Sequence, residues 1–574
     1  MTTEPSIPAS RSAGHLMVEQ LVREGVERVY SVPGESFLDI LDGLYDAPVT
    51  NVVARHEGGA GFMALAEARL TGRPGVVMVT RGPGAANAMI AIHTAYQDQT
   101  PLVMFVGLIP VADRNRESFQ EFDPHAWFGS TAKKVLVLDD PDSAGELVAD
   151  AMRTAAGGRP GPVVIGVPED VLTFPTSVPA LDPRPLPAPA ISPESVAQVR
   201  QAVAEAERPT VVIGGDGWHS GCGADLAAWS AEIGVPVTSD FRAYDAIPSS
   251  SPAWVGGLGY GRSDALAEHF DEADLLLFIG AVRSDVLTDG YTRGLEARAI
   301  VIDPDPDLLG HTGSVEMHIQ ARPADIVPAL IAETPEVSGG CERLQRMRAE
   351  HLLYATERPT NVPASEAEEI GVDLHALMTE LRERTGGEAI VTYGAGNHAL
   401  WPPRYLRHEH PSTLVAPRNG AMGVGIPAAV AAGLVHPDRT VISIAGDGCF
   451  MMNGQEIATA VGYGAKIVVL VIDNGIFATI VEHQERHYPQ RPSGTRMTNP
   501  DFALMAQSYG LHGETVRTNA DIAGAVERAL ASPTGALLHV ITDPALRGPS
   551  GQMPDASRAS GTDENAAQQN GDHT

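Results

Sequence analysis

Two side chains in the last third of the chain, Asp447 and Asn474, have the types and spacing of a site for a metal ion and a phosphate. Asp447 stands in the tripeptide Gly446-Asp447-Gly448. A carboxylate and a carboxamide oxygen suit a hard divalent cation such as Mg2+, which takes few of its oxygen ligands from protein and the rest from phosphate and water. The alternative is a plain turn after a strand, which is the commoner role of Gly-Asp-Gly by itself.

The sequence around these residues predicts a βαβ unit. One apolar, β-branched run begins at Val441, a second occupies 466–472, and a helical segment lies between them. Both runs are apolar throughout, so both strands should be buried on two faces of a parallel sheet. Because the carboxyl ends of parallel strands open onto one crevice, we expect Asp447 and Asn474 to converge there.

The helix of this unit has its own start and stop signals. Asn453 with Glu456 three residues later is the pattern of a capping box, and it predicts a helix that begins at Asn453. Gly462 and Gly464 predict its end.

Composition excludes several classes of protein. The chain has 574 residues, 43% of them hydrophobic, and a net charge of −32, which argues against nucleic acid or an anionic membrane as partner. No apolar run is long enough to span a bilayer, and the N-terminal sequence has no apolar signal segment, so we expect a cytoplasmic protein. Cys222, Cys341 and Cys449 have no metal-ligand spacing, and we expect them to be reduced thiols without a role in metal binding or catalysis.

Strand and helix patterns alternate along most of the chain and predict an α/β fold of three doubly wound parallel-sheet domains. The expected domains are 12–175, 193–335 and 370–545, with a proline-rich linker after the first and a polar helical connector after the second. Residues 546–574 have almost no large apolar side chains and are expected to form a disordered tail.

The interval from the Gly-Asp-Gly turn to Asn474 resembles the signature of thiamine-diphosphate-dependent enzymes. The order of motifs resembles their acetolactate synthase branch, which has a pyrimidine-binding, a middle and a diphosphate-binding domain. The resemblance implies that Asp447, Asn474 and the main-chain carbonyl of Ile476 hold Mg2+ on the diphosphate of the cofactor. Asp473 stands where the family usually has asparagine.

Glu57 belongs to an Arg-His-Glu motif at a predicted strand-to-helix turn. A glutamate in the first turn of a helix is more often a surface charge, but three glycines in the next four positions leave room for a ligand against the backbone. The resemblance implies that Glu57 hydrogen-bonds the aminopyrimidine ring of the cofactor and so promotes formation of its nucleophilic ylid.

The same resemblance implies a cradle for the cofactor. Asn397 replaces the glutamine of the family's Gly-Gln-His turn, and Cys449 stands where the family often has serine, so we expect a weak phosphate donor and not a thiol catalyst. His398 could equally be a capping or core residue, and Met422 could be core filler. The predicted cofactor-binding residues are Gly396, Asn397, His398, Gly420, Met422, Gly446, Asp447, Gly448, Cys449, Asn474, Ile476 and Phe477.

On the substrate side, 118–121 resembles the Ala-Phe-Gln-Glu loop of acetolactate synthases, in which Phe119 and Gln120 would face the reacting carbon. The chain lacks the adjacent histidine pair of simple pyruvate decarboxylases there, which favours ligation over release of aldehyde. Two departures bear on the acceptor. Glu35 stands where acetolactate synthases carry glycine, and His483 where they carry tryptophan.

The middle domain resembles the flavin-holding domain of acetolactate synthases at its turns 257–261, 280–283 and 303–305. Glycine turns after strands are common, and most bind no dinucleotide. The sequence therefore leaves FAD binding open.

Taken with the resemblance, these features predict an enzyme that uses thiamine diphosphate and Mg2+ to decarboxylate pyruvate or a related 2-oxo acid and to ligate the product to a second carbonyl compound. The alternatives are a decarboxylase or C–C lyase that releases aldehyde, and a protein that binds the cofactor without catalysis, against which Glu57 speaks. In the resembled family Glu57 reaches a cofactor held by the other subunit, so we expect a homodimer or homotetramer.

Overall fold

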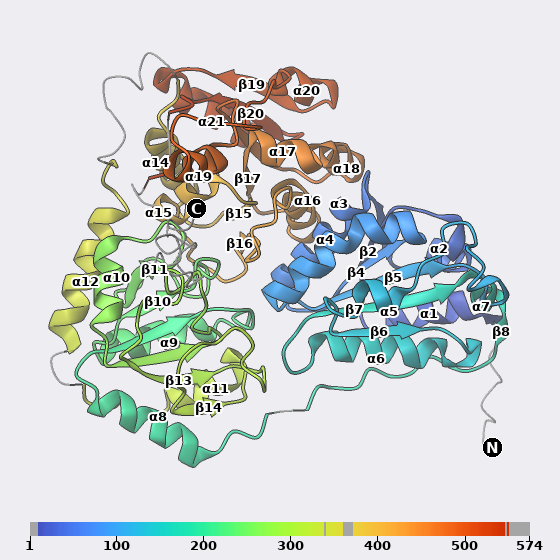
Figure 1. Cartoon of the computed structure of the whole chain (residues 1–574), viewed down its shortest axis with the longest axis horizontal. Helices are drawn as coiled ribbons and strands as arrows, with labels where there is room; N and C mark the ends of the chain where they lie inside the picture. The colour runs from blue at the N-terminus through green and yellow to red at the C-terminus, as the bar shows by residue number, and fades with distance from the viewer. Residues whose placement is uncertain (1–9, 188, 338–339, 360–370, 546–547, 550–574) are drawn as a thin grey trace, which may run out of the picture.

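The computed structural model describes residues 10–187, 189–337, 340–359, 371–545 and 548–549 (Figure 1). Three domains each contain a six-stranded parallel sheet covered by helices on both faces, which confirms the predicted fold class. The domain limits stay predictions, and the predicted tail lies outside the described residues apart from 548–549.

The first sheet has the strand order β3-β2-β4-β5-β7-β6. The strands are all parallel, but the order in which the chain adds them to the sheet reverses between β2 and β4, which makes this the switch point of the sheet. Its strands are β2 (Arg28–Ser31), β3 (Thr50–Val53), β4 (Gly75–Val79), β5 (Leu102–Leu108), β6 (Lys134–Val137) and β7 (Pro162–Pro168). Its helices are α1 (Ala13–Arg23), α2 (Leu38–Asp46), α3 (Glu57–Thr71), α4 (Gly82–Asp98), α5 (Pro124–Phe128), α6 (Ala144–Ala156) and α7 (Glu169–Thr173), and β1 (Arg11–Ser12) pairs with β8 (Pro175–Thr176).

The second sheet has the order β11-β10-β9-β12-β13-β14, with its switch point between β9 and β12. Its strands are β9 (Pro209–Ile213), β10 (Val237–Ser239), β11 (Trp254–Gly257), β12 (Leu275–Ile279), β13 (Arg298–Ile302) and β14 (Met317–Ile319). The helices are α8 (Pro193–Glu205), α9 (Cys222–Glu232), α10 (Asp264–Asp271), α11 (Pro323–Leu330) and α12 (Gly340–Tyr354), of which α12 continues toward the third domain.

The third sheet has the order β16-β15-β17-β18-β20-β19, with its switch point between β15 and β17. Its strands are β15 (Ile390–Tyr393), β16 (Leu414–Val415), β17 (Val441–Gly446), β18 (Val468–Asp473), β19 (His512–Val516) and β20 (Ala536–Ile541). Its helices are α14 (Leu374–Thr385), α15 (Trp401–Tyr405), α16 (Gly425–Val435), α17 (Asp447–Asn453), α18 (Ile457–Tyr463), α19 (Ala478–His487), α20 (Phe502–Ser508) and α21 (Ile522–Ala531).

The predicted βαβ unit is present, and both of its strands are buried. The predicted helix start was wrong, because α17 begins at Asp447 and Asn453 is its last residue. Asn453 instead donates to the carbonyl of Gly423, and the Glu456 carboxylate accepts the Arg55 amide of the first domain at 3.1 Å. The side chains of Asn453 and Glu456 therefore bond distant parts of the chain and do not cap a helix. Gly464 ends α18 in the left-handed conformation, as predicted, whereas Gly462 lies inside the helix.

The first and third domains share a hydrophobic core. α16 is apolar on all sides and rich in alanine and glycine, so it is buried from Gly425 to Gly433 and other helices approach it closely. It packs against α3, and Figure 1 shows α3 and α4 beside it. This shared core fixes the first domain against the third.

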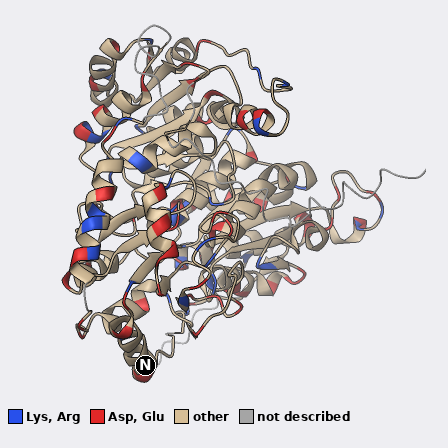
Figure 2. Cartoon of the chain, turned by 60° about the vertical axis from the view of Figure 1, so that its left-hand side comes forward, with Lys and Arg blue, Asp and Glu red and all other residues tan. Residues whose placement is uncertain are grey.

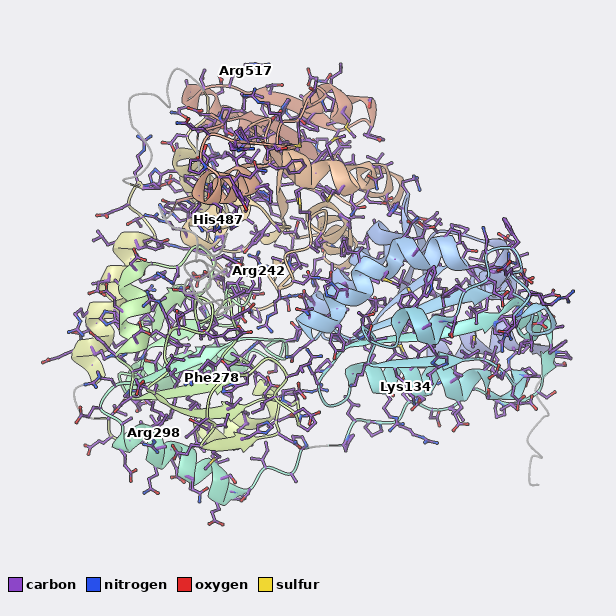
Figure 3. All side chains as sticks on the ribbon, viewed as in Figure 1. Lys134, Arg242, Phe278, Arg298, His487 and Arg517 are labelled. Atoms are coloured by element: carbon purple, nitrogen blue, oxygen red, sulfur yellow. The ribbon has the colours of Figure 1, made fainter. Side chains whose placement is uncertain are left out.

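Charged side chains join all three domains at the centre of the molecule, where Figure 3 labels Arg242. Arg242 donates to the Pro417 carbonyl at 3.0 Å. Arg418 pairs with Asp240 at 2.6 Å, and its amide donates to Asp98. Burial raises the pKa of Asp98 to about 6, although Arg69 opposes the shift. One network therefore joins the C-terminal end of α4 in the first domain to the carboxyl edges of the second and third sheets.

On the surface, Figure 2 shows acidic and basic residues interspersed along the helices. Within the described ranges, no helix has the length and apolar character needed to cross a membrane.

Candidate active site

The predicted cofactor-binding residues converge on one cavity. It has a volume of about 210 Å3 and lies at the switch point of the third sheet. Every residue predicted to bind the cofactor lines it, from Gly396 after β15, through Asp447 after β17, to Asn474 after β18. Sequence reasoning missed Trp401, Thr479 and Ile480, which also line it. They follow no glycine-rich turn and carry no local signal.

Asp447 is buried at the centre of this cavity, with 4% of its surface exposed. Its carboxylate accepts the amides of Gly448 at 2.8 Å and Gly475 at 2.9 Å, and the side-chain amide of Asn499 at 2.8 Å. Burial raises its pKa to about 6, and the neighbouring Asp473 contributes to the shift. A cation bound here would favour the ionised carboxylate and reverse that shift.

Asp473, the departure from the family pattern, has partners that stabilise its charge. His539 contacts it at 2.8 Å, and Asn499 donates to it at 2.8 Å while also bonding Asp447. Burial favours the neutral acid, but these bonds outweigh it and the pKa of Asp473 lies below its ordinary value. Asn499 thus bridges the two carboxylates. In the sequence, only His539, a polar residue in the apolar strand β20, indicated that a buried polar partner lies nearby.

His398 lines the cavity and has a ring nitrogen available for a hydrogen bond. The side chain is buried, and its Nε2 has no hydrogen-bond partner within the part of the chain that the structure describes. Burial lowers its pKa to about 3, so the imidazole is neutral near pH 7 and can donate from one nitrogen. Gly446 must be glycine beside it, because a Cβ there would lie 2.8 Å from His398 Nδ1.

Asn397 and Cys449 are already engaged. Asn397 donates to Glu482 at 2.6 Å and accepts the Thr479 hydroxyl at 2.7 Å, so its side chain anchors α19. The Cys449 sulfur accepts the Gly423 amide at 3.2 Å. Burial raises the pKa of the Cys449 thiol, which keeps it protonated near pH 7.

These residues fit a diphosphate with Mg2+. The cavity holds one buried carboxylate, the Asn474 side chain, the Ile476 carbonyl and the unpaired nitrogen of His398. Among the described residues no cluster of three or more His, Cys, Asp or Glu side chains could hold a metal unaided. A phosphate-borne Mg2+ does not require such a cluster, since phosphate and water complete its coordination.

The remaining predicted residues lie on the first domain, at the carboxyl edge of its sheet. Glu57 opens α3, and its carboxylate accepts the Asn87 side-chain amide at 2.9 Å. The Gln120 carbonyl accepts the Gly82 amide at 3.3 Å, and Phe119 is 77% exposed. No described residue that lines the 210 Å3 cavity belongs to this domain. One chain therefore presents two separate groups of predicted site residues.

The loop that carries Phe119 and Gln120 is clasped by Glu121, whose role the sequence did not reveal. Asn115, Glu117 and Gln120 have left-handed φ angles of 61°, 55° and 63°. The Glu121 carboxylate accepts the amides of Asn115 at 2.5 Å and Ser118 at 3.0 Å. These bonds lower its pKa. They hold the loop in a backbone conformation that such residues rarely adopt.

His483 lies on α19, half-buried, and does not line the cavity. Its predicted influence on the acceptor remains a prediction.

At the switch point of the second sheet, the chain packs against itself. A Cβ on Gly280 would lie 2.5 Å from the Gly214 carbonyl, and one on Gly214 would lie 2.9 Å from Ala281 and 3.1 Å from Arg418. Gly214 and Gly280 therefore serve internal packing at this turn.

A larger cavity of about 440 Å3 lies at the opposite, amino edge of the first sheet. Its charges are largely paired with one another, as in Arg28 with Glu67 and Arg73 with Glu27. It contains none of the predicted site residues.

Comparison with known proteins confirms the resemblance. Residues 11–127 match the N-terminal TPP binding domain of thiamine pyrophosphate enzymes, 196–330 the central domain, and 394–540 the C-terminal TPP binding domain. The probable acetolactate synthase large subunit of Methanocaldococcus jannaschii is 30% identical, over 92% of this chain and 91% of its own length. Probable acetolactate synthase 2, chloroplastic, of Oryza sativa is 31% identical over 92% and 83%, and the isozyme 2 large subunit of Escherichia coli 28% over 92% and 95%. The chain therefore belongs to the thiamine pyrophosphate enzyme family, in its acetolactate synthase-like branch.

Proposed function

We propose that this enzyme decarboxylates pyruvate or a related 2-oxo acid and ligates the remaining fragment to a second carbonyl compound. One observation carries the proposal: the residues predicted to bind a diphosphate and its metal all line one cavity at a switch point. The presence of Glu57 supports catalysis, because a protein that only binds the cofactor has no need of that carboxylate.

Asp447, Asn474 and the Ile476 carbonyl would hold Mg2+, and His398 Nε2 would donate to a phosphate oxygen. Thiamine diphosphate, when bound, supplies the nucleophilic carbon and the electron sink for decarboxylation. Met422 lines the same cavity and would support the cofactor between its two ends. Asp447 and Asn474 directly follow strands, Asp447 and His398 are buried, and all five residues line the cavity.

The first domain would supply the proton and oxyanion chemistry. Glu57, held by Asn87, would exchange a proton with the aminopyrimidine ring. Gln120 would donate from its side-chain amide to the oxyanion that develops on the substrate, since a donor at that position stabilises the transition state. The exposed ring of Phe119 would exclude water, so that ligation outcompetes release of aldehyde.

The two groups would meet across a subunit interface, which makes the active unit at least a homodimer. The support is that the cavity lacks any described residue of its own first domain. A second copy that contributes Glu57 and Gln120 would complete it.

We further propose that the second domain holds no flavin. The support is that Gly214 and Gly280 pack closely against each other at its switch point. Purified enzyme should lack the visible absorbance of a flavin. Stoichiometric release of flavin on denaturation would overturn this point.

The test of function is product identification. Labelled pyruvate is incubated with the enzyme alone and with aldehyde, ketone and 2-oxo acid acceptors, with Asp447→Ala as the inactive control. We expect labelled CO2 and a ligated hydroxyketone. Free aldehyde as the sole product would favour the alternative decarboxylase or lyase, and the absence of CO2 would favour a protein that binds without catalysis.

A further inference from the structure

The first sheet carries a charge cluster at its own switch point, between β2 and β4. Arg81, which precedes α4, donates to Glu35 at 3.0 Å and also to Glu169. We call these three residues the Glu35 cluster. The Arg81 side chain is 9% exposed and that of Glu35 is 60% exposed. Ligands of doubly wound sheets bind at the switch point, so the Glu35 carboxylate stands where a ligand would enter.

The Glu35 cluster and the residues proposed to act on the substrate, Gln120 and Glu57, all lie near the first turn of α4. Arg81 is followed directly by Gly82, whose amide donates to the Gln120 carbonyl. A Cβ on Gly84 would lie 3.4 Å from the Glu57 carboxylate. Glu35 and the proposed reactive groups therefore border one surface.

The charge on this surface is negative. Arg81 contributes one positive charge and contacts two carboxylates, and Glu57 adds a third carboxylate nearby. Two neighbouring arginines have acidic partners of their own: Arg114 pairs with Asp139 at 3.4 Å, and Arg116 with Asp113 at 3.2 Å. The Arg55 guanidinium donates to the Val53 carbonyl at 2.9 Å, and its charge favours the ionised form of Glu456. An anionic group brought here meets a like charge, which disfavours its binding.

We propose that Glu35 selects against acceptors that carry a carboxylate, so that the preferred acceptor is an aldehyde or ketone without one. The inference rests on the proposed function. The donor loses its carboxylate as CO2, and the electron pair left on its carbonyl carbon forms the bond to the carbonyl carbon of the acceptor, whose oxygen takes up a proton. A 2-oxo acid acceptor would keep its carboxylate beside Glu35 throughout ligation.

The test is a competition assay on the full-length enzyme with thiamine diphosphate and Mg2+. Labelled pyruvate is the donor, and acetaldehyde competes with pyruvate as the acceptor. Wild type is compared with Glu35→Gln and Glu35→Gly. The control is Asp182→Asn, which removes an exposed carboxylate that pairs with Arg23 at 3.2 Å and lines the cavity at the opposite edge of the domain.

We expect wild type and Asp182→Asn to favour the acetaldehyde product. Both Glu35 variants should lower the ratio of acetaldehyde product to pyruvate product by about tenfold, the effect of removing one nearby like charge, while CO2 release changes less. A ratio unchanged from wild type in both Glu35 variants would overturn the inference and leave the proposed function standing. Wild type that releases no CO2 would overturn both.

Discussion

The switch points of the first and third sheets hold different kinds of surface. At the third sheet, Asp447, Asn397 and His398 are buried, and the Asp447 carboxylate accepts three hydrogen bonds. At the first sheet, Glu35 and Phe119 are largely exposed, and the loop that carries Phe119 depends on Glu121.

The difference separates two tasks. A buried, pre-organised cradle suits a cofactor that is always the same, because its geometry is fixed before binding. An exposed, charged edge suits a substrate that differs between relatives, since surface loops change with little cost to the core. Substitutions at the third switch point should therefore impair cofactor binding, whereas those at the first should impair catalysis or change the choice of substrate.

The largest expected effect is at the third switch point. Asp447→Ala removes the only carboxylate of the proposed metal set and should reduce cofactor affinity by more than about 100-fold, a loss of roughly 3 kcal/mol. Calorimetry with thiamine diphosphate and Mg2+ measures it. Asp473→Asn is the matched control, because it restores the family residue and leaves Asp447 in place. Equal affinities for Asp447→Ala and wild type would remove Asp447 from the site.

Glu57→Gln should fail at the chemical step and not at binding. The amide keeps the size of the side chain but cannot exchange the proton. We expect cofactor affinity close to wild type and the rate of hydrogen–deuterium exchange at C2 of the bound cofactor to fall by about 100-fold or more. Exchange as fast as in wild type would show that another residue performs this step.

The contrast between the two regions also separates what the sequence could and could not predict. The convergence of Asp447 and Asn474 was predictable, because each directly follows a strand, β17 or β18. The other residues of the cradle were predicted from the family resemblance. Glu456 was assigned to a local cap, yet its partner is Arg55 of another domain. Asn499 and the pairing of Arg81 with Glu35 likewise depend on elements distant in the chain. Such contacts leave no local periodicity in the sequence.

Gln120→Ala should slow ligation by about 100- to 1000-fold if its side chain donates to the oxyanion. CO2 release and aldehyde formation should fall less, so the product ratio shifts toward free aldehyde. Single-turnover analysis with labelled pyruvate and an acceptor measures both rates. Asp182→Asn serves as control, because it changes an exposed side chain at the opposite edge of the domain. Ligation by Gln120→Ala at the wild-type rate would exclude the proposed role.

A smaller effect is expected at the Glu121 clasp. The pKa of Glu121 lies below its ordinary value of 4.5, because the ionised form accepts backbone amides. The clasp is therefore complete above the ordinary pKa and is lost as pH falls through the lowered value. The protection of the Asn115 and Ser118 amides from deuterium exchange, relative to the intrinsic rate at the same pH, should fall at that acidic pH. Glu121→Gln should lower the same protection at neutral pH as well. Exchange that is independent of both changes would mean that the clasp does not order the loop.

Mixing two inactive variants tests most directly whether the two switch points of different chains form one site. Glu57→Gln and Asp447→Ala subunits are each inactive by expectation, and after subunit exchange a heterodimer has one site with both native residues. For random exchange of equal amounts, about a quarter of the sites become complete. We therefore predict recovery of about a quarter of wild-type ligation activity. Mixed activity no greater than the sum of the separate variants, with exchange verified by native mass spectrometry, would contradict the account.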